Sequence, residues 1–493
     1  MYYIGIDLGT SAMKLLLVDE DGKILRSVTR EYPLSMPRPG WSEQNPVDWW
    51  SACLIGAEEL LVGFDRSKVA GIGCGGQMHG LVVLDENDEI IRDAILWNDG
   101  RTAEEVDYLN DTVGREVISG YTANIAFAGF TAPKLLWMKK NEPENFARIS
   151  KIMLPKDYIN YKLTGVHSCD YSDASGMLLL DVKNKKWSSE MLEICSVRED
   201  QMPKLFESYD VIGCLRPEIA TALALPEDVK VVAGAGDNAA AAVGTGTVGD
   251  GKCNISIGTS GTVFISSDRF GKDMDNALHS FAHADGHYHL MGCMLSAASC
   301  NKWFCDEIIR EKDYEAVQSE ISRDRLGENE VFFLPYLMGE RSPINDTDAR
   351  GVFLGMSMNT TRADMAQAIL EGVAFAIKDN IEIARSVGIR IERSKICGGG
   401  ARSKLWQTIF SSVLDIPLDI PVTEEGPGYG GAMLAMVGTG LFPGVRECAE
   451  ALTRVKETVL PDPVLAEKYG KRYSEFKRIY PSVKGLFKEL RRS

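Results

Sequence analysis

The chain has 493 residues, of which 45% are hydrophobic and 25% are charged. This is the composition of a globular protein, and it excludes a disordered, collagenous or coiled-coil chain. The net charge of −16 at neutral pH argues against a nucleic-acid binder, which needs a cationic surface to displace phosphate counterions. The length predicts more than one domain.

The cysteines and the apolar segments indicate the cellular compartment in which the protein acts. Eleven cysteines are scattered without a CxxC pair, which is typical of free thiols in a reducing compartment. The N-terminus has neither a basic segment nor a long apolar run, so we expect no signal peptide. The most apolar stretch, 231–248, is interrupted by Asp237 and is not a membrane span. We therefore expect a cytoplasmic protein that binds no membrane and no nucleic acid.

The first predicted elements are short strands that form a meander. They are expected at 2–8, 14–19 and 23–31. A helix follows at 46–61, with Asn45 as its N-cap, and a strand at 69–74 leads into the sequence GGQMHG. Strands and helices continue to alternate after this point, which predicts the α/β class.

A similar pattern recurs about half the chain later. Residues 254–265 again place a Gly-Thr-Ser turn between two β-rich runs. We therefore predict two domains of related architecture, residues 1–245 and 246–493, with the ligand in a cleft between them. The last segment, 464–493, is expected to be a peripheral helix with a break at Pro481.

The first turn, Asp7-Leu8-Gly9-Thr10-Ser11, is a candidate phosphate site. Small residues let the backbone N–H groups of a hairpin reach a phosphate, and the hydroxyls of Thr10 and Ser11 add donors. Asp7, at the end of its strand, is placed to hold a hydrated Mg²⁺ beside that phosphate. Lys14 follows closely. An ordinary β-turn capped by Asp7 is an equal alternative.

A second glycine turn supports the same interpretation. The sequence Gly258-Thr259-Ser260-Gly261 would face the same phosphates from the other domain. The pattern GxxxxGK[ST] is absent from the chain, so a P-loop enzyme is excluded.

A third glycine segment offers a place for the nucleotide. A strand ending at Cys397 runs into glycines, and the bare backbone of Gly399, Gly400 and Ala401 suits a base or a ribose. The pattern is not GxGxxG, so a Rossmann dinucleotide site is not indicated. A plain strand-to-helix turn before a helix near Ser403 stays the alternative.

The strand at 231–235 delivers Asp237 and Asn238 into a turn rich in glycine and alanine. A carboxylate in such apolar surroundings needs a partner or a task. Asp237 could accept a proton from a substrate hydroxyl. The alternative is that Asp237 caps the small-residue helix that follows.

Polar and aromatic residues after two further strands are candidates for sugar binding. They are Met78 and His79, and then Trp97 with Asp99. A ring face suits sugar C–H groups, and polar side chains suit hydroxyls. A core histidine and a core tryptophan are the alternatives.

Four histidines lie within a short segment, at His279, His283, His287 and His289. No cysteine or carboxylate pair completes a helical zinc ligand set, so a metal site is disfavoured. We expect a hairpin over 278–291 that turns at Asp285-Gly286 and exposes these histidines.

These elements, in this order, resemble the FGGY family of carbohydrate kinases. Residues 129–141 resemble the first signature of the family, and residues 351–356 with 364–371 resemble the second. The resemblance extends from Tyr3 to about Gly440. It implies two actin-like (ribonuclease H-like) ATPase domains with a central cleft, and it implies a homodimer.

The resemblance also implies roles for individual residues. Asp237 would be the general base at the C5 hydroxyl of the sugar, and Asp7 would lie near Mg²⁺ and the transferring phosphate. The implied sugar contacts are Met78, His79, Trp97, Asp99 and Asn238. The implied phosphate contacts are Thr10, Ser11, Lys14, Gly258 and Thr259. Gly399, Gly400 and Ala401 would line the adenine and ribose. Ala12-Met13 stands where the family pattern has Gly-Val, which weakens the expectation for Lys14.

Within the family, stretches such as GQMHG, AILWNDGR and AGAGDNAA resemble the members that act on xylulose. The expected reaction is therefore the MgATP-dependent phosphorylation of D-xylulose to D-xylulose 5-phosphate. Two alternatives stay open. One is an FGGY kinase for ribulose, gluconate or a deoxysugar, and the other is a non-catalytic protein that binds sugar and ATP on the same fold.

Overall fold

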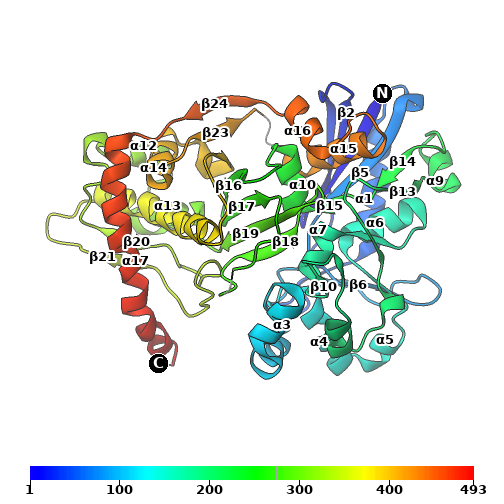
Figure 1. Cartoon of the computed structure of the whole chain (residues 1–493), viewed down its shortest axis with the longest axis horizontal. Coiled ribbons are helices and arrows are strands. Elements are labelled where there is room, and N and C mark those ends of the chain that lie inside the picture. The colour runs from blue at the N-terminus through cyan, green and yellow to red at the C-terminus, as the bar shows by residue number, and fades with distance from the viewer. Residues whose placement is uncertain (274, 423–424, 493) are drawn as a thin grey trace.

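The computed structural model of the protein describes residues 1–273, 275–422 and 425–492. In this part of the chain, two seven-stranded mixed sheets form the framework, each in one half of the molecule (Figure 1). The first sheet runs from β13 (Val211–Cys214) through β14 (Lys230–Val232), β5 (Val69–Gly76), β1 (Tyr2–Leu8) and β2 (Ala12–Asp19) to β3 (Ile24–Glu31), with β15 (Ala235–Gly236) beside β5.

The predicted meander is confirmed. Strands β1, β2 and β3 pair as antiparallel neighbours, while β5 lies parallel to β1, β14 and β15. The first helix, α1 (Pro46–Leu60), begins as expected, because the Asn45 side chain accepts a hydrogen bond of 3.0 Å from the backbone N–H of Val47.

The second sheet repeats the arrangement of the first. Its strands, in order, are β18 (His279–Ala282), β19 (Tyr288–Met294), β17 (Gly261–Ser267), β16 (Cys253–Ile257), β22 (Ser394–Cys397), β23 (Leu418–Pro421) and β24 (Val455–Val459). The β16–β17 hairpin and its parallel neighbour β22 correspond to the β1–β2 hairpin and β5. The predicted relation between the two halves of the chain is therefore present in the topology.

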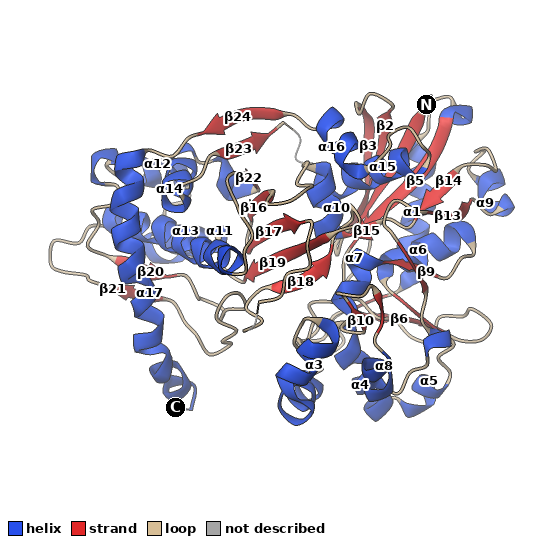
Figure 2. Ribbon diagram, viewed as in Figure 1, coloured by secondary structure: helices blue, strands red, loops and turns tan. Residues whose placement is uncertain are grey.

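The chain between β5 and β13, together with the short strand β4 that precedes β5, builds a region of small helices and strand pairs, at the lower right of Figure 2. The helices are α2 (Ala103–Asp107), α3 (Arg115–Thr122), α4 (Thr131–Asn141), α5 (Pro143–Ala147), α6 (Pro155–Thr164), α7 (Tyr171–Ala174) and α8 (Ser189–Cys195). The strand pairs are β4 (Glu43–Gln44) with β7 (Ala94–Ile95), β6 (Val82–Leu84) with β8 (Lys151–Met153), β9 (Ser168–Asp170) with β12 (Lys204–Phe206), and β10 (Leu180–Asp181) with β11 (Lys186–Trp187). A core of its own holds this region together.

Helices cover the second sheet as well (Figure 2). They are α11 (Ala298–Trp303), α12 (Tyr314–Ser319), α13 (Arg362–Ser386), α14 (Lys404–Leu414) and α17 (Pro463–Arg492), with the strand pair β20 (Phe332–Leu334) and β21 (Val352–Leu354) beside them. Among the helices of the described residues, none is both long and apolar enough to cross a membrane.

Glycines let helices from both halves of the chain pack together on the first sheet. Helix α10 (Asp237–Gly244) contacts α15 (Gly426–Gly438), and α15 lies on β1 and β5. A Cβ atom on Gly73 would lie 2.1 Å from the carbonyl oxygen of Gly431, a distance that no side chain can adopt. Helices α9 (Pro217–Ala222) and α16 (Val445–Leu452) also lie on the side of the first sheet. The predicted division at 245/246 lies just after α10 and stays a prediction.

The prediction of a break at Pro481 is wrong. Helix α17 continues from Pro463 to Arg492 with Pro481 inside it. The helix buries Tyr469, Tyr473 and Phe476 against the second core, and this packing outweighs the hydrogen bond that a proline removes.

Candidate active site

The strand register brings Asp7 and Asp237 to one edge of the first sheet. Asp7 on β1 pairs with Gly75 on β5, and Gly75 pairs with Ala235 on β15. Asp237 is the first residue of α10, directly after β15. Because these three parallel strands end at the same edge, two carboxylates that are 230 positions apart (7 and 237) in the sequence become neighbours.

Burial raises the pKa of both carboxylates. The pKa of Asp7 rises to about 7, first through burial and then through the negative charge of Asp237, while Lys14 opposes the shift. Burial raises the pKa of Asp237 to about 6. Hydrogen bonds of 2.7 Å from the backbone N–H of Asn238 and 3.0 Å from its side-chain amide oppose that rise. This pair is therefore suited to accept a proton or to meet a cation.

Hydrogen bonds fix the shape of the first glycine turn. The backbone N–H of Gly9 donates to the carbonyl of Ala12 at 3.1 Å. The indole N–H of Trp97 donates to the Thr10 hydroxyl at 2.9 Å, and the Gln44 amide donates to the Thr10 carbonyl at 2.6 Å. The neighbouring Ser11 is exposed. Thr10 is therefore held at the tip of the turn, with Trp97 beside it.

Lys14, on β2, forms an ion pair with Glu425 from the second half of the chain. Its ammonium group also lowers the pKa of Asp7, so it lies near the carboxylate pair. A direct contact between Lys14 and a phosphate stays a prediction.

Met78 and Asn238 lie beside Asp237, and His79 follows Met78 in the chain. The Met78 sulfur lies 4.0 Å from the Asn238 amide nitrogen, and a Cβ on Gly236 would lie 2.9 Å from Met78 Cγ. His79 Nδ1 lies 2.7 Å from the Gly176 carbonyl oxygen, in a residue with a φ of 71°. Two of the predicted sugar residues, Met78 and Asn238, therefore lie beside the candidate base, and His79 is the next residue after Met78.

His79 is a neutral ring with a defined tautomer. Burial holds the pKa of His79 well below its ordinary value. Since the Gly176 carbonyl can only accept, Nδ1 carries the proton, and Nε2 is left as an acceptor. The ring packs 4.7 Å from that of Phe130. This geometry suits the hydroxyl of a sugar as a donor to Nε2.

The carboxylate of Asp99 already has hydrogen-bond partners within the protein. One carboxylate oxygen accepts from the Arg101 Nε at 2.8 Å, and the other accepts from Arg101 at 2.7 Å and from the Ser42 backbone N–H at 2.6 Å. The Asp99 side chain is fully buried, whereas 43% of Trp97 is exposed. A direct contact between Asp99 and a sugar stays a prediction that this geometry does not favour.

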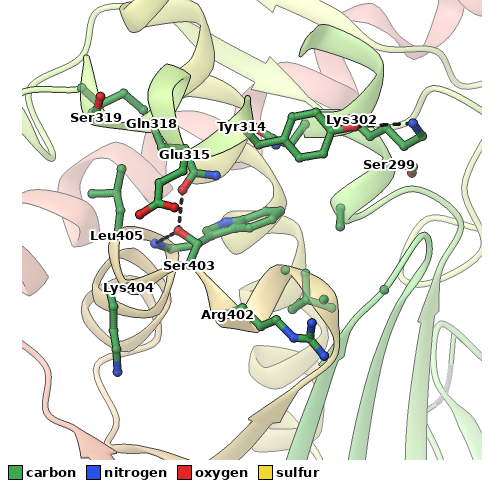
Figure 3. A pocket seen from close by; sticks show the side chains of 18 of the residues that line it. Ser299, Lys302, Tyr314, Glu315, Gln318, Ser319, Arg402, Ser403, Lys404 and Leu405 are labelled. Atoms are coloured by element: carbon green, nitrogen blue, oxygen red, sulfur yellow. Dashed lines mark hydrogen bonds between the residues drawn. The ribbon is translucent and has the colours of Figure 1, made fainter. Parts of the chain in front are cut away.

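A cavity of about 1070 Å³ opens in the second half, between the second glycine turn and the triple glycine. Gly258, Thr259, Gly399 and Gly400 line it, as the nucleotide prediction requires. Figure 3 shows its polar wall, where the Ser403 hydroxyl donates to Gln318 at 2.5 Å and Lys302 contacts Tyr314. The volume is at the upper end of the range for small-molecule sites, enough for a nucleotide.

The glycine segment after Cys397 differs from the expectation in the position of Ala401. Gly399–Arg402 forms a short 3-10 turn before α14, whose N-cap is Ser403. Ala401 is buried and lines an adjacent cavity of about 340 Å³ instead of the larger one. The contact of Ala401 with a nucleotide stays a prediction.

The prediction of exposed histidines is wrong for three of the four. The hairpin of β18 and β19 is present, but His279, His283 and His289 are buried within it. The His289 ring stacks 4.0 Å from that of Phe264. Two strands of a covered sheet bury both of their faces, which an isolated hairpin would not do. Across the described residues, no three His, Cys, Asp or Glu side chains are grouped as a metal site.

Known proteins match this chain over nearly its whole length. The profile of the "FGGY family of carbohydrate kinases, N-terminal domain" matches residues 2–244, and that of the C-terminal domain matches residues 253–439. The xylulose kinase of Escherichia coli K12 is 39% identical over 98% of this chain and 99% of its own length. That of Klebsiella pneumoniae is 40% identical over the same shares of the two chains.

This chain belongs to the FGGY family of carbohydrate kinases.

Solved structures agree with this assignment. A kinase of Brucella ovis described as a "xyloylose kinase" superposes on this carbohydrate kinase with a TM-score of 0.94 at 38% identity, covering 99% of this chain and all of the other. A ligand-bound xylulose kinase and a gluconate kinase, both from Lactobacillus acidophilus, each give a TM-score of 0.94 at 26% identity, covering 99% of both chains in each case. The predicted two-domain FGGY fold is therefore confirmed.

The sequence reasoning missed two charged residues of this kinase. The Arg341 guanidinium lies 5.4 Å from the ring of Phe127, which packs on Phe130 and so on the aromatic group beside His79. Lys156 is buried behind the strand that leads to Asp237. A charge inside an apolar run is the signal that could have identified both residues, as in LPYLMGERSP and IMLPKDYIN.

Proposed function

We propose that this carbohydrate kinase transfers the γ-phosphoryl group of ATP to the C5 hydroxyl of D-xylulose. The observation that carries the proposal is the shared sheet edge, where Asp237 and Asp7 lie beside Met78 and His79. Relatives named xylulose kinase, at 39% and 40% identity over 98% of the chain, support the choice of sugar.

Asp237 has the position and the pKa of a general base. It lies beside Asn238 and Met78, and a carboxylate whose pKa is about 6 is ionised at neutral pH and still basic. It takes the proton of the C5 hydroxyl as that oxygen attacks the γ-phosphorus, and the bond from the γ-phosphorus to the oxygen that bridges it to the β-phosphate of ATP breaks. His79 Nε2 accepts from another sugar hydroxyl and orients the ketose.

Mg²⁺ fits the residues around Asp7. Its carboxylate offers the oxygen donors that Mg²⁺ prefers, and a single carboxylate with water and phosphate oxygens is a usual ligand set. A nearby cation would relieve the repulsion that raises the pKa of Asp7. When bound, Mg²⁺ supplies charge neutralisation at the phosphate oxygens. Asp7 is then the residue that holds it.

The nucleotide would occupy the cavity of the second half. Gly399 and Gly400 would lie along the adenine and ribose, and Thr259 would reach the phosphates. Thr10 and Ser11 approach the same phosphates from the first glycine turn. The predicted domains 1–245 and 246–493, the homodimer and the cytoplasmic location also belong to this proposal.

A second candidate acceptor is gluconate, because a gluconate kinase shares the fold at a TM-score of 0.94. The identity of 26%, against 39% for the Escherichia coli xylulose kinase, favours xylulose. Gluconate also brings a carboxylate, which would meet the charge of Asp237.

The test measures ADP release with a panel of acceptors: D-xylulose, D-ribulose, D-gluconate and no sugar. We expect kcat/KM for D-xylulose to exceed that for each other acceptor by on the order of 10-fold or more, the discrimination that a few hydrogen bonds provide. A ketose that lacks the C5 hydroxyl is the matched control, and it should bind without releasing ADP. A preference for gluconate, or no sugar-dependent ADP, would refute the proposal.

A further inference from the structure

A lysine and three aspartates are buried beside the segment that leads to Asp237. We call Lys156, Asp157, Asp170 and Asp173 the Lys156 cluster. The Lys156 ammonium lies 2.6 Å from Asp157, 3.0 Å from Asp170 and 3.7 Å from Asp173, and no side chain of the cluster is more than 1% exposed. The cluster lies on α6, α7 and the end of β9, beside β15 in Figure 1. No substrate can reach it directly.

The charges of the cluster do not balance, since three carboxyl groups face one ammonium. Burial works to lower the pKa of Lys156, but the aspartates together hold it well above its ordinary value. Burial raises the pKa of Asp173 well above its ordinary value, against the pull of Lys156. Neither Asp173 oxygen has a hydrogen-bond partner in the described part of the chain. Burial therefore favours the neutral form of the Asp173 carboxyl, while the neighbouring aspartates favour the charged form of Lys156.

Lys156 and three residues beside the cluster hydrogen-bond to the backbone just before Asp237, at three of its polar groups. The Ala233 carbonyl accepts from the Lys156 ammonium at 3.3 Å and from the Asn160 amide at 2.8 Å. The Gly234 N–H donates to the Ser208 carbonyl at 2.9 Å. The Gly236 N–H donates to the Ser172 hydroxyl at 3.1 Å.

Two of the residues that hold this backbone, Ser172 and Ser208, are hydrogen-bonded to Asp170. One of its oxygens accepts from the Ser172 hydroxyl at 2.5 Å and from the Ser208 hydroxyl at 2.8 Å. The backbone of this segment packs closely on β5, because a Cβ on Gly234, at a φ of +73°, would lie 2.0 Å from the Cys74 carbonyl oxygen. One continuous network therefore runs from Lys156 through Asp170 and Ser172 to the residue before Asp237.

We propose that the Lys156 cluster positions Asp237, with Ser172 as the residue that transmits its hold to the Gly236 backbone. The inference rests on the proposed function, because it assumes that Asp237 acts on the acceptor hydroxyl. Lys156 and Ser172 are positioning residues and touch no substrate. An error of about 1 Å in the placement of a reacting group lowers a rate by on the order of 100-fold, so a small relaxation of residues 233–236 is enough to matter.

The test compares Ser172→Ala with Ser168→Ala. Ser172→Ala removes the acceptor for the Gly236 N–H. Ser168→Ala removes a buried hydroxyl from the neighbouring strand that has no hydrogen bond in the described residues, so it controls for the loss of a buried oxygen. We expect Ser172→Ala to lower kcat by on the order of 10- to 100-fold with KM for sugar and for ATP within about twofold. Ser168→Ala should leave all three near wild type.

A second readout does not depend on the acceptor. Amide hydrogen exchange of a peptide covering 233–238 should become faster in Ser172→Ala and stay unchanged in Ser168→Ala. If the wild type phosphorylates another sugar in the panel, kcat is measured with that sugar. If it phosphorylates none, the proposed function fails, and exchange still tests the hold on the backbone. Wild-type exchange in Ser172→Ala, or a rise in KM with unchanged kcat, would overturn the inference. In the folded fraction of the Lys156→Met variant, kcat should be lowered by the same factor as in Ser172→Ala.

Discussion

At the scale of single residues, Asp237 combines burial with a proposed role, general base, that needs its charged form. Burial raises its pKa to about 6, and Asn238 keeps it from rising further. A base must be unprotonated to act, so activity should rise with pH through this value and then level off. At saturating Mg²⁺, which would keep Asp7 ionised, we expect kcat/KM to fall about tenfold for each pH unit below about 6, the slope of a single essential deprotonated group.

Replacing Asp237 by Asn tests the same residue directly. The amide keeps the size of the side chain but cannot take a proton, so kcat should fall by roughly 10²- to 10⁴-fold. Sugar affinity, measured by calorimetry, should stay within a few-fold. The exposed Asp228 is the control, because Asp228→Asn changes the same charge far from the sheet edge. Near-normal turnover of Asp237→Asn would remove the base assignment.

The role proposed for Asp7 would oppose the stability of the folded protein. Burial raises the pKa of Asp7 from 3.8 to about 7, so the folded state binds this proton more tightly than the unfolded state. The stability that the protonated carboxyl contributes is complete below about pH 4 and is lost as pH rises through 7. Above pH 7 the folded protein therefore carries an unfavourable charge.

We predict that Asp7→Asn stabilises the ligand-free enzyme while it abolishes turnover. At pH 8 the variant should gain on the order of 2 kcal/mol, seen as a Tm several degrees higher. At pH 4 the gain should vanish, because Asp7 is then protonated in the folded protein. Thermal unfolding at both pH values measures this, and a Tm at pH 8 below that of the wild type would contradict it.

At the scale of elements, the contact of α15 with the first sheet depends on missing side chains. Glycines on both partners let the backbones touch, and a Cβ on Gly431 would lie 2.5 Å from the Gly73 carbonyl oxygen. Helix α15 also carries Gly428, whose Cβ would lie 3.6 Å from that of Asp7. The packing of this helix therefore shapes the floor of the active site.

Gly431→Ala should destabilise the protein although alanine favours a helix. The clash is with backbone, so we expect a loss of roughly 1–3 kcal/mol or more. Gly470→Ala in α17 is the matched control, because nothing lies within 4 Å of its Cβ, and it should gain about 0.5–1 kcal/mol. Denaturant unfolding of both variants measures the difference. Equal effects would show that α15 does not pack this closely.

At the scale of the whole molecule, the proposed function assigns the two substrates to different sheets. The residues proposed for the sugar lie at the edge of the first sheet, while the cavity proposed for the nucleotide is built on the second. A change in the cavity should therefore act on one substrate alone. The meeting of the two substrates depends on how the two halves of the chain sit together.

Gly399→Leu tests this separation. Gly399 is exposed, lines the cavity and has no atom within 4 Å of its Cβ position, so the new side chain should enter the nucleotide space without harming the fold. We expect KM for ATP to rise by on the order of 10-fold, about 1.4 kcal/mol of lost binding, with KM for the sugar unchanged. Gly485→Leu, in open space on α17, should change neither. Parallel rises in both KM values would argue against separate sites.

The sequence alone determined the local elements, because their causes are local. Alternating apolar residues formed β1, the Asn45 side chain capped α1, and glycines marked the turns at Thr10 and Thr259. The recurrence of the hairpin also indicated two related halves. Long collinear motifs identified the family, since many short matches in order exclude chance.

Only the tertiary structure decided which side chains meet. The pairing of Asp7 with Asp237 depends on the register of three strands that are far apart in the chain, and no local pattern encodes that register. The same is true of the burial of His279 and His289, which follows from sheet neighbours, and of the burial of Asp99 against the Ser42 backbone. The burial of a side chain and its hydrogen-bond partners are properties of the packed molecule. They set the pKa values of the carboxylates and the hydrogen bonds that hold the backbone before Asp237.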